Sequence, residues 1–183
     1  MTKVKTERHK LIYANILLFF LFSFLGWVLE KLWFYFCYGV NADRGFLTLP
    51  FCTIYGFSIL FLRAALGRPL KYDPPFPLNL LQIVCYIALC ALVATLAEAV
   101  TGLFFERVFS LRLWVYEWPY SAVHGYICLP MSIAWGFMIA AAISLIWLPL
   151  EKLLLRVPHA VLGFSSGVLL LAVTLDFFLT AFL

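Results

Sequence analysis

Three carboxylic acids stand inside long apolar stretches of the sequence: Glu30, Glu98 and Asp176. A charged side chain at the centre of a membrane helix costs about 2.5–3.5 kcal/mol on insertion scales, so an acid there is retained for a function or for a specific partner. Counted at about 1.5 Å per helical residue, each acid lies past the midplane, toward the outer leaflet in the orientation given below. The three acids are therefore the first candidates for a binding site.

Each acid shares a helical face with small or polar residues. Such faces point into a helix bundle rather than toward lipid, because small residues let helices approach closely. We therefore expect the three acids to line a polar pocket in the outer half of the bilayer. The residues on these faces are Ser23 and Gly26 with Glu30, then Ala91, Thr95 and Gly102 with Glu98, then Ser165, Ala172 and Thr180 with Asp176.

A repeated string supplies further candidates. Residues 44–57 and 124–137, here called the first and second return segments, align without a gap 80 positions apart. Gly and Pro in register carry weight because these residues fix backbone geometry. We expect the glycines to form tight turns. The prolines suit the first turn of the following helix, or the end of a short extended entry to it. The identical pairs are Gly45 and Gly125, Leu49 and Leu129, Pro50 and Pro130, Gly56 and Gly136, and Phe57 and Phe137.

The return segments also place polar and aromatic side chains at matching positions. Arg44 and His124 occupy one position, and we expect them to cap the pocket. Tyr55 and Trp135 occupy another. The full set of candidate substrate-binding residues is Glu30, Arg44, Tyr55, Glu98, His124, Trp135 and Asp176.

A structural role for the acids is the alternative. Glu30 and Glu98 could pair with Arg44, Arg107 or Arg112 and so fix the turns to the helices. Both interpretations follow from the same residues, and the sequence leaves them open.

Signatures of catalysis and of metal or cofactor binding are absent from the sequence. It contains no nucleophile elbow, zinc-protease helix or nucleotide-binding loop motif. The five cysteines show no pairing or histidine spacing typical of zinc, and the three histidines are dispersed. We expect no catalytic residue, no metal and no cofactor. An enzyme acting on lipid through the acids and His124 is a third hypothesis, which lacks a nucleophile.

Composition identifies the chain as an integral membrane protein. Of its 183 residues, 65% are hydrophobic and only 12% are charged, and the mean hydropathy is +1.01. Soluble domains have roughly 45–50% apolar and about 25% charged residues. The net charge of +4 comes from basic residues spread over short loops, so it indicates membrane orientation and no nucleic-acid partner.

The sequence predicts an all-α membrane protein with five transmembrane helices, because a span needs about 20 apolar residues. The repeat divides this single transmembrane domain (residues 1–183) into two parallel helical hairpins, at about 13–66 and about 78–150, and an extra helix at about 160–183. The predicted spans are roughly Tyr13–Tyr38, Phe46–Ala65, Leu78–Phe105, Tyr126–Leu150 and Ala160–Leu183.

Basic residues set the orientation. Nine Lys and Arg residues fall on the side of the N-terminus and four on the other side. Cytoplasmic loops carry the excess of positive charge, so the N-terminus is predicted inside and the C-terminus outside. Both return segments then lie at the outer face.

Several motifs in order resemble a family of small bacterial membrane proteins described as putative ABC-transporter type IV permeases. The resemblance covers roughly residues 16–148. Val115 and the turn from His124 to Tyr126 depart from the family pattern. The motifs are Phe24–Glu30, Arg44–Pro50, Ile54–Gly56, Arg112–Trp114 with Tyr116, Gly125, Ile127–Leu129 and Trp135–Gly136.

The resemblance implies a multi-pass protein of the bacterial cytoplasmic (inner) membrane. It also implies a permease-like or substrate-capture subunit for an unknown small molecule, working with a separate ATPase or another membrane subunit. Residues 63–77 would then form a cytoplasmic docking loop. The alternative is a non-transporting scaffold or sensor whose buried acids are structural.

Overall fold

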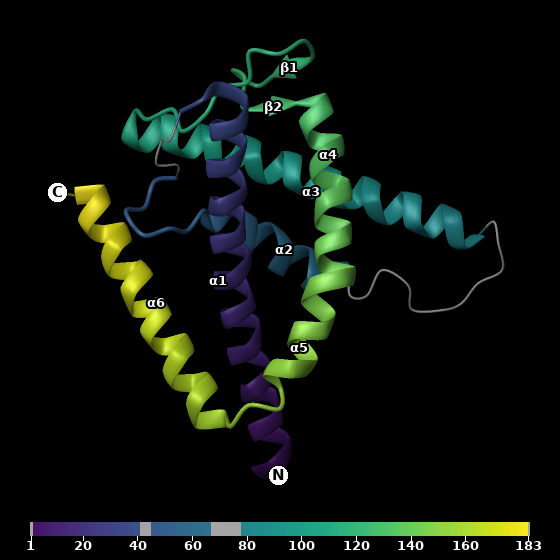
Figure 1. The fold of residues 1–183 in the computed structure, drawn as a ribbon, viewed down its shortest axis with the longest axis vertical. Helices are drawn as coiled ribbons and strands as arrows, with labels where there is room; N and C mark the ends of the chain where they lie inside the picture. The colour runs from purple at the N-terminus through teal and green to yellow at the C-terminus, as the bar shows by residue number, and fades with distance from the viewer. Residues whose placement is uncertain (1, 41–44, 67–77, 183) are drawn as a thin grey trace. The chain divides into compact units, whose positions relative to one another are not determined.

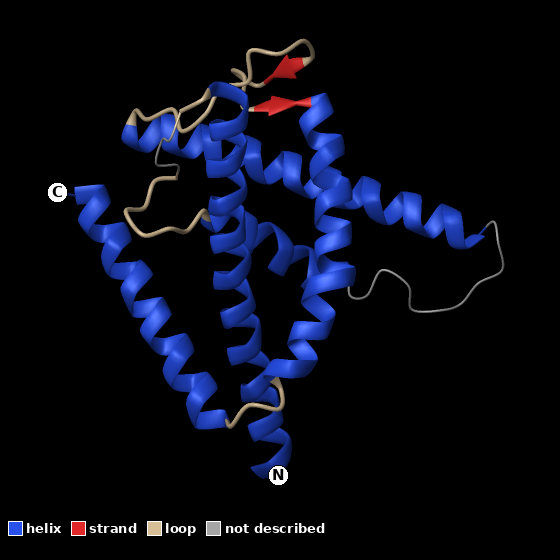
Figure 2. Cartoon of the chain, viewed as in Figure 1, coloured by secondary structure: helices blue, strands red, loops and turns tan. Residues whose placement is uncertain are grey.

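A computed structural model of the protein describes residues 2–40, 45–66 and 78–182. It is mostly helical, at 79%, with one small two-stranded sheet (Figure 2). Four helices within the described residues are long and apolar enough to cross a membrane, which agrees with the predicted all-α membrane fold. They are Thr6–Cys37, Leu80–Phe109, Leu129–Leu154 and His159–Phe182.

The elements follow one another along the chain as Figure 1 labels them. Helices alternate with short connections, and the only strands in the described ranges form a hairpin before α4. The bounds are α1 Thr2–Tyr38, α2 Thr53–Leu66, α3 Leu78–Phe109, β1 Ser121–Ala122, β2 Ile127–Cys128, α4 Leu129–Ala141, the π-helix η1 Ala142–Trp147, α5 Leu148–Leu154 and α6 His159–Phe182.

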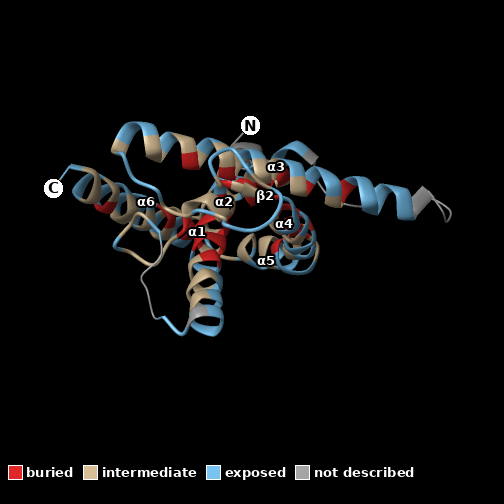
Figure 3. Ribbon diagram, turned by 90° about the horizontal axis from the view of Figure 1, so that it is seen from above, coloured by how far each residue is buried: buried red, intermediate tan, exposed pale blue. Residues whose placement is uncertain are grey.

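The chain divides into two compact units. Unit one comprises residues 1–57 and 148–183, and unit two comprises residues 58–147. In unit one, α1 packs against α6, with the Tyr13 ring against Gly163. The buried residues of α1 lie in its middle, from Ala14 to Gly26 (Figure 3).

The second predicted span is helical only from Thr53 onward, rather than from Phe46. Pro50 has no N–H to donate to a helix, and it biases Leu49 before it toward extended backbone. The Cys52 N–H donates instead to the Ser23 carbonyl, at 3.0 Å, so the segment docks on α1 before α2 begins. Pro50 therefore precedes α2, whereas Pro130 lies in the first turn of α4.

In unit two, α3 packs along α4. The fourth predicted span starts as strand β2 and becomes helical at Leu129. Its helix changes to π geometry over Ala142–Trp147, just before Pro149. Pro149 cannot donate to the carbonyl four residues earlier, and wider helical turns commonly absorb such a defect.

Two glycines allow close helix contacts. A Cβ built on Gly56 would lie 2.6 Å from the Phe19 carbonyl oxygen and would also meet the Ser23 hydroxyl. A Cβ built on Gly136 would lie 2.8 Å from the Ile87 carbonyl oxygen and 2.9 Å from the Ala91 Cβ. A backbone oxygen cannot move aside as a flexible side chain can, so both positions require glycine.

We therefore expect Gly56→Ala and Gly136→Ala each to lower the free energy of unfolding by about 1–3 kcal/mol, the usual cost of overpacking. Gly167→Ala is the matched control, because nothing lies within 4 Å of the added methyl group. It should be neutral or stabilising, since alanine favours a helix over glycine by roughly 0.5–1 kcal/mol. Denaturant titration in detergent micelles measures all three. Equal stability of the three variants would contradict the close contacts.

Candidate functional site

Asp176 holds the first return segment against α6. Its carboxylate, on a residue only 7% exposed, accepts a hydrogen bond from the Thr48 hydroxyl. The backbone N–H of Leu49 donates to the other carboxylate oxygen at 3.0 Å. Hydrogen bonds to a carboxylate are roughly twice as strong as those between neutral groups. Asp176 thus fixes the irregular backbone that precedes α2.

Glu30 holds the other end of the same segment. The Tyr55 hydroxyl donates to Glu30 Oε1 at 2.8 Å. The Tyr55 ring lies over Gly26, one helical turn earlier on α1, where a Cβ would collide with the ring. Together with the backbone bond from Cys52 to Ser23, this contact ties the first return segment to α1 at two points. Between Thr48 and Tyr55, the segment is therefore held by both α1 and α6.

Glu98 plays a similar part in unit two. It is 7% exposed, and its Oε1 accepts two hydrogen bonds. The Tyr116 hydroxyl donates at 2.8 Å, and the Trp135 indole N–H donates at 3.0 Å. Tyr116 belongs to the loop before β1 and Trp135 to α4, so one carboxylate on α3 joins the loop and the second return segment.

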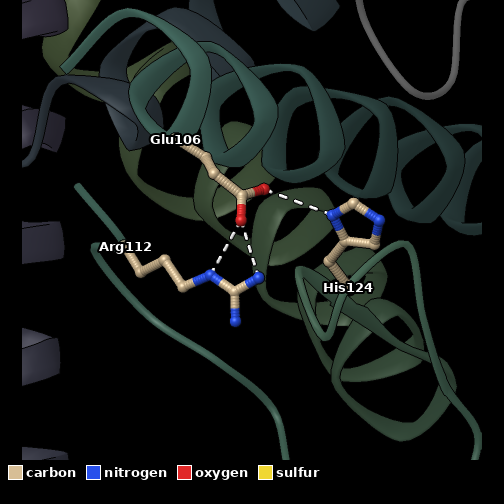
Figure 4. A network of polar contacts seen from close by, with 3 residues as sticks. All are labelled: Glu106, Arg112 and His124. Atoms are coloured by element: carbon tan, nitrogen blue, oxygen red, sulfur yellow. Dashed lines mark hydrogen bonds and ion pairs between the residues drawn. The ribbon is translucent and has the colours of Figure 1, made fainter. Parts of the chain in front are cut away.

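A more exposed network lies at the end of α3 (Figure 4). Arg112 donates to Glu106 Oε1 through Nε at 2.8 Å and Nη2 at 2.6 Å. His124 Nδ1 lies 3.2 Å from Glu106 Oε2. The hydrogen bond to Glu106 raises the pKa of Arg112, and burial raises the pKa of the Tyr126 phenol. Glu106 therefore connects the loop after α3 with the turn that carries His124.

The turn at the second return segment has an uncommon backbone. Val123 and His124 have φ of 52° and 58°, and Gly125 has φ of 84°. Positive φ is unusual for a non-glycine residue and most unusual for a β-branched one. Contacts hold the turn: the Gly125 carbonyl accepts from the Tyr116 N–H at 2.7 Å, and the Tyr126 ring covers Gly102. Gly45, at the matching position of the first segment, has φ of 102°.

The structure thus brings some predicted residues together. Tyr55 meets Glu30, and Trp135 meets Glu98. His124 contacts Glu106 rather than a buried acid. Arg112, which the structural alternative considered as a partner of Glu30 or Glu98, also binds Glu106. Lys31 lies over the Trp27 ring, 4.8 Å from its centroid. Arg44, and residues 67–77 of the expected docking loop, lie outside the described residues.

Sequence reasoning did not select Thr48, Tyr116 or Glu106. Thr48 lies within the repeated string, but threonine has no counterpart at that position in the second copy, which has Cys128. Tyr116 lies in a loop rich in aromatic residues. Such loops are typical of a membrane interface, so the sequence did not indicate that Tyr116 donates a hydrogen bond. Glu106 could have been predicted from the sequence as an ion-pair partner, because it lies in the last turns of an apolar helix and Arg112 follows six residues later.

Among the described residues, no group of three or more His, Cys, Asp or Glu could hold a metal ion. The polar chemistry of the site is hydrogen bonding by carboxylates. Each of the three membrane acids accepts at least one hydrogen bond from a return segment. The arrangement can hold those segments in place, and it offers carboxylates to which a bound molecule could donate.

The helices define a multi-pass membrane protein, and its polar side chains are gathered where irregular backbone meets those helices. The comparison with protein families matches residues 17–181 to the family described as Putative ABC-transporter type IV, and the chain belongs to that family. The match extends beyond the resemblance at residues 16–148 to include α6. Comparisons with curated proteins and with solved structures gave no match.

The Glu98 contacts predict a measurable loss of stability. Trp135→Phe and Tyr116→Phe each keep an aromatic ring but remove one donor from a buried carboxylate. Each should lower the free energy of unfolding by about 1–3 kcal/mol. In a Glu98→Gln background the same substitutions should cost less, because the charged acceptor is gone. Trp118→Phe, at an exposed position, should change nothing. A full cost that persists beside Glu98→Gln would show that Glu98 is not the partner.

Proposed function

We propose that this protein is a permease-like or substrate-capture subunit of an ABC-type transport system, powered by a separate ATPase. Membership of the transport-associated family and the apolar helices support this assignment. The observation that carries it is the set of hydrogen bonds between the membrane acids and the return segments. Irregular backbone at membrane depth is tolerated only where protein or a water-filled cavity surrounds it, and in transporters such backbone is found at substrate sites.

The proposal includes an internal repeat of residues 13–66 and 78–150. Gly56 packs on Phe19 and Ser23, and Gly136 packs on Ile87 and Ala91. Tyr55 donates to Glu30, and Trp135 donates to Glu98. In every case the two partners on the first helix are 68 positions apart, and the two on the return segment are 80 positions apart. Equivalent contacts at constant offsets support two copies of one hairpin, followed by the extra helix at residues 160–183.

The proposed topology has five crossings of the bacterial inner membrane, with the N-terminus inside. The distribution of basic residues supports it. The 14 residues of α2 extend about 21 Å as a helix, short of the roughly 30 Å hydrocarbon core. Residues 45–52, which are not helical, would complete the second crossing. The other four crossings would correspond to the four long apolar helices.

In this account, the substrate exchanges hydrogen bonds with the acids. A small molecule with N–H or O–H donors would compete with Tyr55 for Glu30 and with Trp135 for Glu98. Gly45 and Pro50 would shape the backbone near Glu30, and Gly125 and Pro130 the backbone near Glu98. Arg44 and Asp176 complete the proposed binding set in unit one, and His124 completes it in unit two. No residue is assigned a catalytic role, consistent with a family of transport-associated membrane proteins.

A non-transporting scaffold or sensor is the second candidate function. The specific observation in its favour is that every one of the three acids already has a donor from within the chain. Acids of this kind would hold the return segments permanently and would need no ligand.

A ligand-binding screen separates the two functions. Purified wild-type protein would be melted in the presence of vitamins, nucleosides, amino acids and lipids, because a ligand that binds the native state raises the melting temperature. The transport proposal expects at least one class to raise it. Glu30→Gln and Glu98→Gln should remain folded but lose that rise, whereas exposed Glu117→Gln should keep it. A full response from both variants refutes the proposed site. Absence of any ligand response favours the scaffold.

A further inference from the structure

Two histidines meet at the end of unit one that carries the N-terminus. His9 lies on α1, and His159 is the first residue of α6. Their ring centroids are 6.3 Å apart, with an angle of 49° between the ring planes. These are two of the three histidines in the sequence, although 150 positions separate them. The fold therefore joins two dispersed imidazoles into one pair.

Tyr13 fixes the distance between the helices that carry them. Its ring contacts His159 at 5.2 Å between centroids and His9 at 6.4 Å, so the three rings form a triangle in which none separates the other two. On α6, the Tyr13 ring packs against Gly163, one turn after His159. Lys10 donates from Nζ to the Leu155 carbonyl at 3.2 Å, which directs its charge toward the end of α5. The two imidazoles therefore lie beside a packed contact between α1 and α6.

We propose that His9 and His159 bind a divalent first-row transition-metal ion, with water molecules completing its coordination. Imidazole nitrogen is the commonest protein ligand for such ions and suits Zn²⁺, Ni²⁺ and Cu²⁺. With metal–nitrogen bonds of about 2.0–2.1 Å, the centroids of two rings on one tetrahedral ion lie roughly 5 Å apart. The observed 6.3 Å is about an ångström larger, a gap that rotation of the two side chains can close.

Such an ion would cross-link α1 to α6. These helices come from opposite ends of the chain, and both belong to unit one. A ligand that binds only the folded state stabilises it, so metal should make unit one harder to unfold. This role requires no transported substrate, because none of Glu30, Glu98 and Asp176 is a proposed ligand of the ion.

The test is thermal unfolding of the full-length, tag-free protein in detergent with Cu²⁺, Ni²⁺, Zn²⁺ or Mg²⁺. Cu²⁺ should raise the melting temperature by several degrees and more than Ni²⁺ or Zn²⁺, following the usual affinity order, whereas Mg²⁺ prefers oxygen ligands and should have no effect.

Phenylalanine variants separate metal binding from ring packing. His9→Phe and His159→Phe keep an aromatic ring in the triangle but remove the ligand nitrogens, so each should fold and lose the Cu²⁺-induced rise. His124→Phe removes the remaining histidine and should respond like wild type. Electron paramagnetic resonance of bound Cu²⁺ should show two coupled imidazole nitrogens in wild type and no such pair in either variant.

Two results would overturn the proposal. One is an equal Cu²⁺ response in wild type, His9→Phe and His159→Phe, which would place the metal elsewhere. The other is no response in wild type, which would leave the pair as an aromatic contact only.

Discussion

A carboxylate within a membrane protein must find hydrogen-bond donors, because neither lipid nor apolar side chains can supply them. That constraint organises both units. In unit one, Asp176 and Glu30 take their donors from Thr48, Leu49 and Tyr55. In unit two, Glu98 takes donors from Tyr116 and Trp135. The acids therefore hold the irregular segments between helices in position.

Small residues make these hydrogen bonds geometrically accessible. Gly26 leaves room for the Tyr55 ring, which can then extend its hydroxyl to Glu30 one turn further along α1. Gly136 brings α4 close to α3, next to the residue, Trp135, whose indole reaches Glu98. Loss of either glycine should thus disturb both the packing and the polar contact beside it. Packing and electrostatics are coupled at these positions rather than independent.

Sequence patterns were sufficient for the membrane class and for the unusual backbone at Gly45 and Gly125, because these depend on composition and on local steric rules. The start of α2 was placed too early, since an apolar run gives no sign of where a helix begins. The donors to the acids were also missed in part. Tyr116 lies 18 positions from Glu98 and Thr48 lies 128 positions from Asp176, and only the folded chain brings these donors to the acids.

The central claim is that Asp176 holds the first return segment in place, and the buried thiol of Cys52 reports on it directly. The measurement is the rate at which a membrane-permeant alkylating reagent modifies Cys52, followed by peptide mass spectrometry in wild type and in Asp176→Ala. Cys90, buried on α3 in unit two, is the internal control. Our account predicts slow modification of both thiols in wild type. In the variant, Cys52 should react at least ten times faster while Cys90 is unchanged. Equally slow modification of Cys52 in both proteins would contradict it.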